Sequence, residues 1–258
     1  MPEGDTVYRA AHALNLVLAG RELTEFDLRV PQAATVDLRG EVVHEVVPRG
    51  KHFLHRIGEH TLHSHLKMEG YWHIYDRGAR WRRPAFQARA VVGTLQKQTV
   101  GFDLADIAVV RTRDEDSLVG HLGPDPLADD WDPVEAARRL GADTRDIHVA
   151  LLDQRNIAGF GNEYACEMLF VRGVAPRTPA PEVDVAALIE VGVRMIRMNV
   201  QRPGPRVFTG DARPGRTDWV HGRDGKACRR CGTLIRLDHL GADPTKLRQV
   251  WWCPNCQR

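Results

Sequence analysis

The chain of 258 residues carries 36 lysines and arginines against 34 acidic residues, a formal net charge of +2. Its 43% hydrophobic and 27% charged residues are typical of a folded globular protein and argue against a disordered chain. No apolar run approaches the roughly 18 residues that would span a membrane. The N-terminus carries acids where a secretory signal would carry lysines and then an apolar stretch. We therefore expect a cytoplasmic protein with no membrane partner.

The first part of the chain predicts one helix followed by an antiparallel sheet. Apolar residues recur at helical spacing from Val7 to Leu18, with Asp5 as the expected N-cap and Gly20 as the stop. Short β-branched runs with alternating polarity follow from Glu22 to about Val110, which favours a sandwich or barrel. The expected strands include 41–47, 52–57, 61–66 and 71–75.

A run rich in Gly, Pro and Asp at 120–132 indicates a linker between domains. Helical periodicity then returns, and residues 200–225, rich in Arg, Gly and Pro, predict an extended connector. In the long helix, Met198 is expected on or near the apolar face. The expected helices cover 133–140, 146–154, 162–172 and 183–199.

Four of the five cysteines form two Cys-x-x-Cys pairs separated by 21 residues. This spacing suits a tetrahedral site with no open position, which predicts one structural Zn²⁺ held by Cys228, Cys231, Cys253 and Cys256. Redox dithiols are the alternative, disfavoured because the surrounding pattern is not βαβ. Zinc binding is worth on the order of 10–16 kcal/mol in such short segments and would stabilise this one. Cys166 lies in an apolar helical stretch and is expected in the core.

Arginines and lysines outnumber acidic residues from Gln201 to Arg258. A basic segment fits a polyanionic partner such as DNA, although a solvated basic surface explains it equally well. Arg229, Arg230 and Arg248 flank the cysteines and are candidate DNA contacts.

Pro2 would carry a free secondary amine once Met1 is removed. An α-amine titrates near 8, well below lysine, so it can attack an electrophilic carbon at neutral pH, and Glu3 beside it could donate a proton. Pro-Glu also simply begins many helices, and this is the more common role of such a pair.

Four segments, in order along the chain, together resemble the Fpg/Nei family of DNA glycosylases, nearest its actinobacterial endonuclease VIII branch. They are MPEGDTV at the start, RGKHFL at 49–54, LLDQRNIAGFGNEYACEMLF at 151–170 and WWCPNCQR at the end. The resemblance implies an α+β protein with an N-terminal antiparallel β-sandwich domain behind a leading helix at 1–122 and a linker at 123–132. A helical domain at 133–225 would contain a helix–two-turn–helix at 146–172, and a zinc finger would occupy 226–258.

The resemblance also implies a bifunctional glycosylase and abasic-site lyase of base excision repair, a monomer that binds damaged double- or single-stranded DNA in the nucleoid. Pro2 would attack C1′ of the damaged nucleotide, Glu3 would act as the general acid, and β,δ-elimination would follow. Lys51 and Arg248 would assist catalysis and bind phosphate, as Asn162 would at a helix start. The alternatives are an ordinary hairpin lysine for Lys51, a generic basic residue on the zinc ribbon for Arg248 and a helix N-cap for Asn162.

The resemblance places Met68 among the side chains that fill the space left by a flipped nucleotide, with core packing as the rival explanation. Two departures from the family pattern matter. Thr6 stands where many relatives have a second glutamate, and 101–111 lacks the wedge Arg and Phe of the Fpg branch, which favours oxidised pyrimidines over 8-oxoguanine. A non-catalytic lesion-binding relative and a tautomerase that uses Pro2 as a base are the competing functions.

Overall fold

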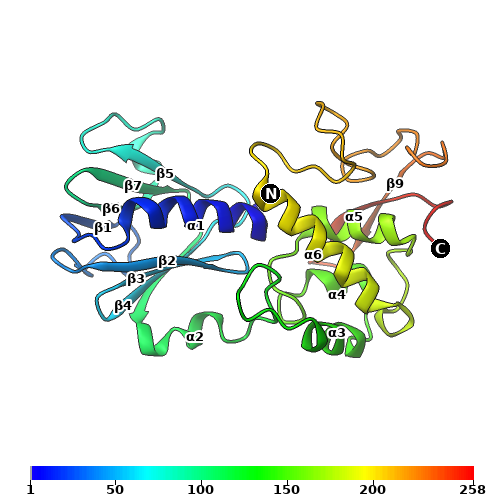
Figure 1. Ribbon diagram of the computed structural model, residues 1–258, viewed down its shortest axis with the longest axis horizontal. Helices are drawn as coiled ribbons and strands as arrows, with labels where there is room; N and C mark the ends of the chain where they lie inside the picture. The colour runs from blue at the N-terminus through cyan, green and yellow to red at the C-terminus, as the bar shows by residue number, and fades with distance from the viewer. Residues whose placement is uncertain (1) are drawn as a thin grey trace. The chain divides into compact units, whose positions relative to one another are not determined.

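The computed structural model describes residues 2–258 and divides into two compact units, Met1–His121 and Leu122–Arg258 (Figure 1). Met1, whose removal would expose the amine of Pro2, lies outside the described residues. Among the described residues, no helix is both long enough and apolar enough to cross a membrane.

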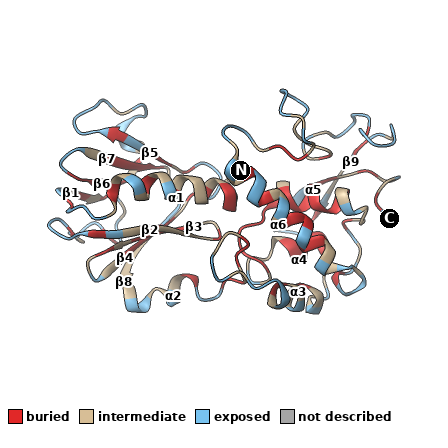
Figure 2. Cartoon of the chain, in the orientation of Figure 1, coloured by how far each residue is buried: buried red, intermediate tan, exposed pale blue. Residues whose placement is uncertain are grey.

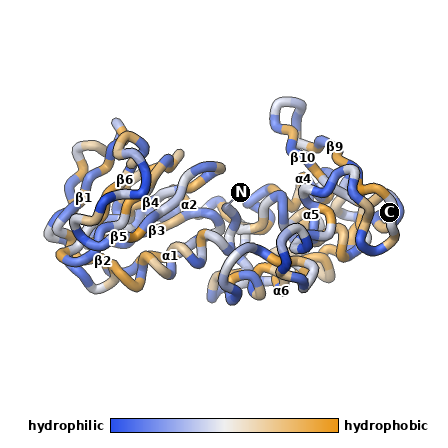
Figure 3. The backbone as a smooth tube through the Cα atoms, turned by 90° about the horizontal axis from the view of Figure 1, so that it is seen from above, coloured by the Kyte–Doolittle hydropathy of each residue, from blue (hydrophilic) through white to orange (hydrophobic). Residues whose placement is uncertain are grey.

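Helix α1, Gly4–Leu18, is the first element of the first unit. Hydrophobic and hydrophilic residues alternate along it in Figure 3, and the hydrophobic residues of one face are buried. The predicted cap at Asp5 is wrong. Glu3 is the N-cap, with extended backbone, and its carbonyl accepts hydrogen bonds from the amides of Thr6 and Val7. Asp5 instead lies in the first helical turn, where it is buried and complements the helix dipole.

Two four-stranded antiparallel sheets form the rest of the first unit, as expected for a sandwich. One sheet has the order β1-β6-β7-β5 and the other β2-β3-β4-β8, and residues from both share the main core with α1. The first sheet comprises β1 Glu25–Leu28, β5 Tyr71–Asp76, β6 Ala88–Gly93 and β7 Lys97–Phe102; the second comprises β2 Val43–Arg49, β3 His52–Ile57, β4 His60–His65 and β8 Asp106–Arg111. Short helices η1 Ala85–Gln87, η2 Thr112–Asp114 and α2 Asp116–Val119 complete the unit.

The strand predicted at 41–47 runs from Val43 to Arg49 instead. Val42 forms only an isolated bridge with Glu22, and the ladder with β3 begins at Val43↔Ile57, is irregular between Val43 and Glu45, and continues to Arg49↔His52. Periodicity could not show this, because a bulge is set by the partner strand.

The second unit begins with four longer helices, α3 Pro133–Ala142, α4 Ile147–Leu152, α5 Asn162–Arg172 and α6 Val185–Gln201, with η3 Ala180–Glu182 before α6. Figure 2 shows α4 buried almost throughout. The expectation for Met198 is wrong: its side chain is 52% exposed. Cys166, as expected, is buried in the core.

No helix or strand occurs between α6 and the final hairpin, β9 Arg236–Leu240 and β10 Arg248–Trp252. The hairpin packs on α5 through a core that includes Phe170, Val250 and Trp251. The end of the chain is bound to the end of α5, because the Arg258 amide donates to the Gly173 carbonyl and the Gln257 side chain donates to that of Val174.

Candidate active site and DNA interface

The direction of α1 relative to β2 decides where the N-terminus lies. The Gly20 amide donates to the Val43 carbonyl, and Oδ1 of Asn15 accepts from the Val46 amide, both at 2.7 Å, so helix and strand run antiparallel. From Asn15 back to Glu3 is roughly 18 Å of helix, and from Val46 on to Lys51 is roughly 17 Å of strand. Pro2, Glu3 and Lys51 therefore lie at one end of the first unit, the end at which α1 begins in Figure 1.

Lys51 lies in the two-residue turn between β2 and β3, and Gly50 before it has a φ of +57°, which favours glycine. Pro2 is half-buried and precedes the helix, so it does not form part of the first turn. Glu3, the next residue, is fully buried.

Three histidines on β3 and β4 lie beside this turn. His52 Nδ1 lies 2.7 Å from His63 Nε2, and the rings of His52 and His65 are 4.7 Å apart. Burial, with smaller contributions from neighbouring charges that include Lys51, lowers the pKa of His52 to about 3 and that of His65 to about 4. These imidazoles are neutral at pH 7, so Lys51 carries the positive charge of the group.

Met68 lies in the turn that follows β4, at the same end of the sandwich because His65 pairs with His52. Its side chain is 58% exposed, so the rival explanation of core packing is wrong. Lys67 before it has a φ of +50°, a strained value for a non-glycine residue, which turns the chain sharply at this point.

Asn162 is the first residue of α5, and Gly161 occupies the N-cap position, so the alternative of an asparagine cap is wrong. Gly159, with a φ of +95°, makes the turn before it. His148 Nε2 lies 3.0 Å from Asn162 Oδ1. Because that oxygen can only accept, the imidazole donates, and both amide hydrogens of Asn162 stay available beside the helix start.

Glu167, also on α5, is fully buried and accepts hydrogen bonds from three successive amides. The donors are the amides of Trp219, Val220 and His221, at 2.8 to 2.9 Å. Burial raises the pKa of this carboxyl to about 7, although the three amides oppose that change. The carboxyl therefore fixes the connector that leads to the cysteines.

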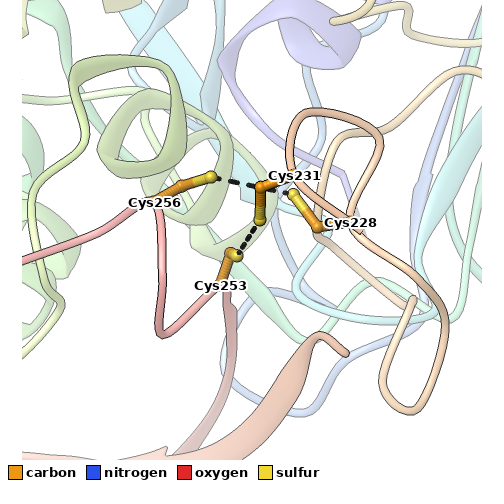
Figure 4. Close-up of side chains that lie close together, drawn as sticks. All are labelled: Cys228, Cys231, Cys253 and Cys256. Carbon is orange, nitrogen blue, oxygen red and sulfur yellow. Dashed lines mark hydrogen bonds between the residues drawn. The ribbon is translucent and has the colours of Figure 1, made fainter. Parts of the chain in front are cut away.

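The four paired cysteines converge, with their sulfurs within 4.8 Å of one another (Figure 4). Cys228 Sγ is 4.0 Å from Cys256 Sγ, and Cys231 Sγ is 3.5 Å from Cys253 Sγ. Four thiolates at about 2.3 Å from a tetrahedral Zn²⁺ would lie about 3.8 Å apart, so the spacing fits the ion. The Arg230 amide also approaches Cys228 Sγ at 3.4 Å, which suits a thiolate.

Of the three arginines flanking the cysteines, two stabilise the fold. Arg229 donates to the carbonyls of Asp218 and Gly215, and Arg230 lies 4.4 Å from the centre of the Phe170 ring. Arg248, at the start of β10, is exposed, and no ion pair within the described residues holds it. It is the arginine of this group that can reach a ligand.

The sequence did not predict two residues that hold the site in place: His148, which contacts Asn162, and Glu167, which contacts residues 219–221. His148 and Glu167 carried no motif of their own, and only a histidine or glutamate in an otherwise apolar helical stretch signalled them. The hydroxyl of Thr6, at the departure from the family pattern, lies 3.5 Å from the buried carboxylate of Asp5.

Comparisons with known proteins cover the whole chain. The N-terminal domain of formamidopyrimidine-DNA glycosylase matches residues 1–115, and the H2TH domain of that enzyme matches residues 122–202. An endonuclease 8 2 of Mycobacterium tuberculosis is 47% identical over the full length of both chains. A probable endonuclease 8 2 of Streptomyces coelicolor is 46% identical over all of this chain and 94% of its own.

A DNA-(apurinic or apyrimidinic site) lyase of Mycolicibacterium smegmatis is 44% identical over all of this chain and 99% of its own. Among solved structures, MutM in complex with DNA containing carbocyclic 8-oxo-G aligns over both full chains with a TM-score of 0.81 at 23% identity, and so shows the same fold. The chain therefore belongs to the formamidopyrimidine-DNA glycosylase family and groups with its actinobacterial endonuclease 8 members.

Proposed function

We infer that this protein is a bifunctional DNA glycosylase and abasic-site lyase of base excision repair. The observation that carries the proposal is the grouping of Pro2, buried Glu3 and Lys51 at one end of the sandwich, in a chain 44% identical over its whole length to a relative named as an abasic-site lyase. Endonuclease 8 relatives and the missing wedge residues together favour oxidised pyrimidines as the bases removed.

The chemistry uses the free amine of Pro2. Its nitrogen forms a bond to C1′ of the damaged nucleotide as the bond from C1′ to the base breaks, and Glu3 donates a proton to the base or sugar. The C1′–O4′ bond then breaks, O4′ takes the proton, and the Pro2 nitrogen forms an iminium with C1′. This iminium makes the C2′ proton acidic, so β-elimination breaks the C3′–O3′ bond and releases the 3′ phosphate. δ-Elimination then releases the 5′ phosphate. Lys51 binds a phosphate near the lesion and stabilises negative charge there.

The second unit provides the remaining contacts with DNA. Asn162, at the start of α5, donates from its side-chain amide to a phosphate. Arg248 binds phosphates next to the flipped nucleotide. Met68 fills the space that the nucleotide leaves, for which a flexible, exposed thioether is suited.

One structural Zn²⁺ held by Cys228, Cys231, Cys253 and Cys256 stabilises the C-terminal hairpin. The sulfur spacing and the amide donor to Cys228 support this assignment. With four thiolates, the ion would have no open position and would take no part in the reaction.

Borohydride trapping on an oligonucleotide with an abasic site tests the function. We expect a covalent adduct with protein that has lost Met1. The adduct should be absent with Pro2→Gly or with protein that keeps Met1, whose Pro2 nitrogen is an amide. A wild-type protein without Met1 that forms no adduct would instead be a lesion-binding relative without chemistry.

A further inference from the structure

The segment between β5 and β6, which we call the arginine loop (residues 79–87), spans the whole length of its sheet. It follows β5, whose last residue Asp76 pairs with Lys97 at one end. It leads into β6, whose first residue Ala88 pairs with Phe102 at the other end. The chain must therefore run back along the sheet, and Figure 1 shows it above β5.

Aromatic side chains anchor the arginine loop to the outer face of the sheet. Trp81 donates from Nε1 to Gln98 Oε1 at 2.6 Å, and its ring meets the Phe102 ring edge-on. The Arg82 amide donates to the Tyr75 hydroxyl at 3.1 Å. With Trp81 directed inward, the side chains around it are left in solvent on a well-fixed backbone.

The arginines of this loop have no acidic partners. Arg80, Arg82 and Arg83 are exposed, and among the described residues no carboxylate forms an ion pair with them. Arg83 lies over the Tyr71 ring at 5.1 Å, and residues 79–85 line a groove of about 580 Å³. Three unpaired guanidinium groups within four positions create a strong local positive potential.

The far end of the arginine loop adjoins the turn that carries Met68. Gln87 accepts a hydrogen bond at its carbonyl from the Asp103 amide, at 2.9 Å. A Cβ on Gly70, two residues after Met68, would lie 3.1 Å from the Asp103 carbonyl oxygen. Phe86, at this end, is 77% exposed. An exposed aromatic ring therefore lies at the same end of the sheet as the candidate void-filling residue.

We propose that the arginine loop is a further nucleic-acid-binding surface, in which Arg80, Arg82 and Arg83 bind phosphates and Phe86 stacks on an unpaired base. The proposal rests on the proposed function for the presence of DNA. Guanidinium groups near an exposed aromatic ring suit a polynucleotide better than an acidic peptide, since the guanidinium groups bind phosphates and the ring stacks on bases. Continuity with the Met68 turn places the surface beside the lesion.

Salt dependence tests the phosphate contacts. Binding of the variant R80Q/R82Q/R83Q to a duplex with a tetrahydrofuran abasic analogue is measured by fluorescence anisotropy over a range of salt concentrations. The slope of log K against log salt is negative, and each lost phosphate contact makes it less steep by about 0.9. We therefore expect the slope of the variant to be less steep by about 2 to 3. The matched control is R39Q/R111Q/R113Q, which removes the same charge from arginines that are paired with carboxylates. Equal slopes for the two variants would overturn the proposal.

Phe86→Ala tests stacking, with Leu95→Ala as control. Leu95 is 81% exposed and lies at the opposite end of the sheet, in the turn between β6 and β7. We expect Phe86→Ala to weaken binding of a single-stranded oligonucleotide roughly tenfold and Leu95→Ala to leave it unchanged. Equal effects of the two substitutions contradict the stacking role.

Borohydride trapping of the same proteins separates the two hypotheses. An adduct with R80Q/R82Q/R83Q at saturating DNA, together with unchanged slopes, would overturn the loop proposal and leave the lyase function intact. A less steep salt dependence for R80Q/R82Q/R83Q, together with no adduct in the wild type, would support the loop proposal and overturn the lyase function.

Discussion

His148 donates a hydrogen bond from Nε2 to Oδ1 of Asn162 across 3.0 Å, and so determines which way the asparagine amide faces. The ring is fully buried, and burial lowers its pKa to about 4, so it is neutral at pH 7 and donates as the Nε2–H tautomer. This makes His148 a positioning residue for the proposed phosphate contact.

A double-mutant cycle tests that role. Asn162→Ala should weaken binding of duplex DNA roughly tenfold for every lesion, because a phosphate contact carries no base information. His148→Phe should weaken it comparably on its own and add little in the Asn162→Ala background. Anisotropy with a tetrahydrofuran duplex measures all four proteins. Additive losses would show that His148 acts independently of Asn162, and selective loss for one base would show that Asn162 does not bind phosphate.

Glu167→Gln should destabilise the second unit by about 1–3 kcal/mol. The amide that replaces one carboxylate oxygen would face a backbone N–H with its own donors, leaving both unsatisfied among buried groups. Urea unfolding measures the change, and Glu190→Gln on the exposed face of α6 is the control. A stability equal to that of the control would mean that the connector is held by other contacts.

Cys228→Ser should abolish stoichiometric metal binding and lower the melting temperature, since three thiolates cannot close the tetrahedral site. Cys166→Ala is the matched control, because Cys166 is buried outside the cluster and should keep one zinc per chain. Metal analysis of both purified proteins checks this. Full zinc content in Cys228→Ser would disprove the assignment of the ligands.

His55 predicts a pH dependence of stability. It is fully buried, and burial lowers its pKa from 6.5 to about 4, although a backbone contact with Leu62 opposes that change. Between those values the unfolded chain binds the proton and the folded chain does not, so stability falls as pH falls from 6.5 towards 4. The loss attributable to this group reaches about 3 kcal/mol.

His55→Leu should remove that contribution and stabilise the protein at pH 5 more than at pH 7, while the exposed His12→Leu should do neither. Thermal unfolding at the two pH values checks the difference. An unchanged pH dependence in His55→Leu would assign the acid sensitivity to the other buried histidines.

Sequence periodicity and turn residues predicted most helices and strands, and α5 and β3 lie at their predicted bounds although both are buried on more than one face. The cysteine cluster followed equally from spacing. Contacts between distant segments could not be predicted this way. Nothing local to Glu167 or His148 specifies a partner 52 or 14 residues away, and nothing in 79–87 indicates that Trp81 anchors a loop across a sheet.

The contact of Glu167 with residues 219–221 also bears on how the second unit assembles. Helix α5 can form from neighbouring residues, but its carboxyl finds its amide partners only after a chain segment of 52 to 54 residues has closed. Closing so long a loop is entropically costly and slow compared with local helix formation. The docking of residues 219–221 onto α5 should therefore be a late event in folding.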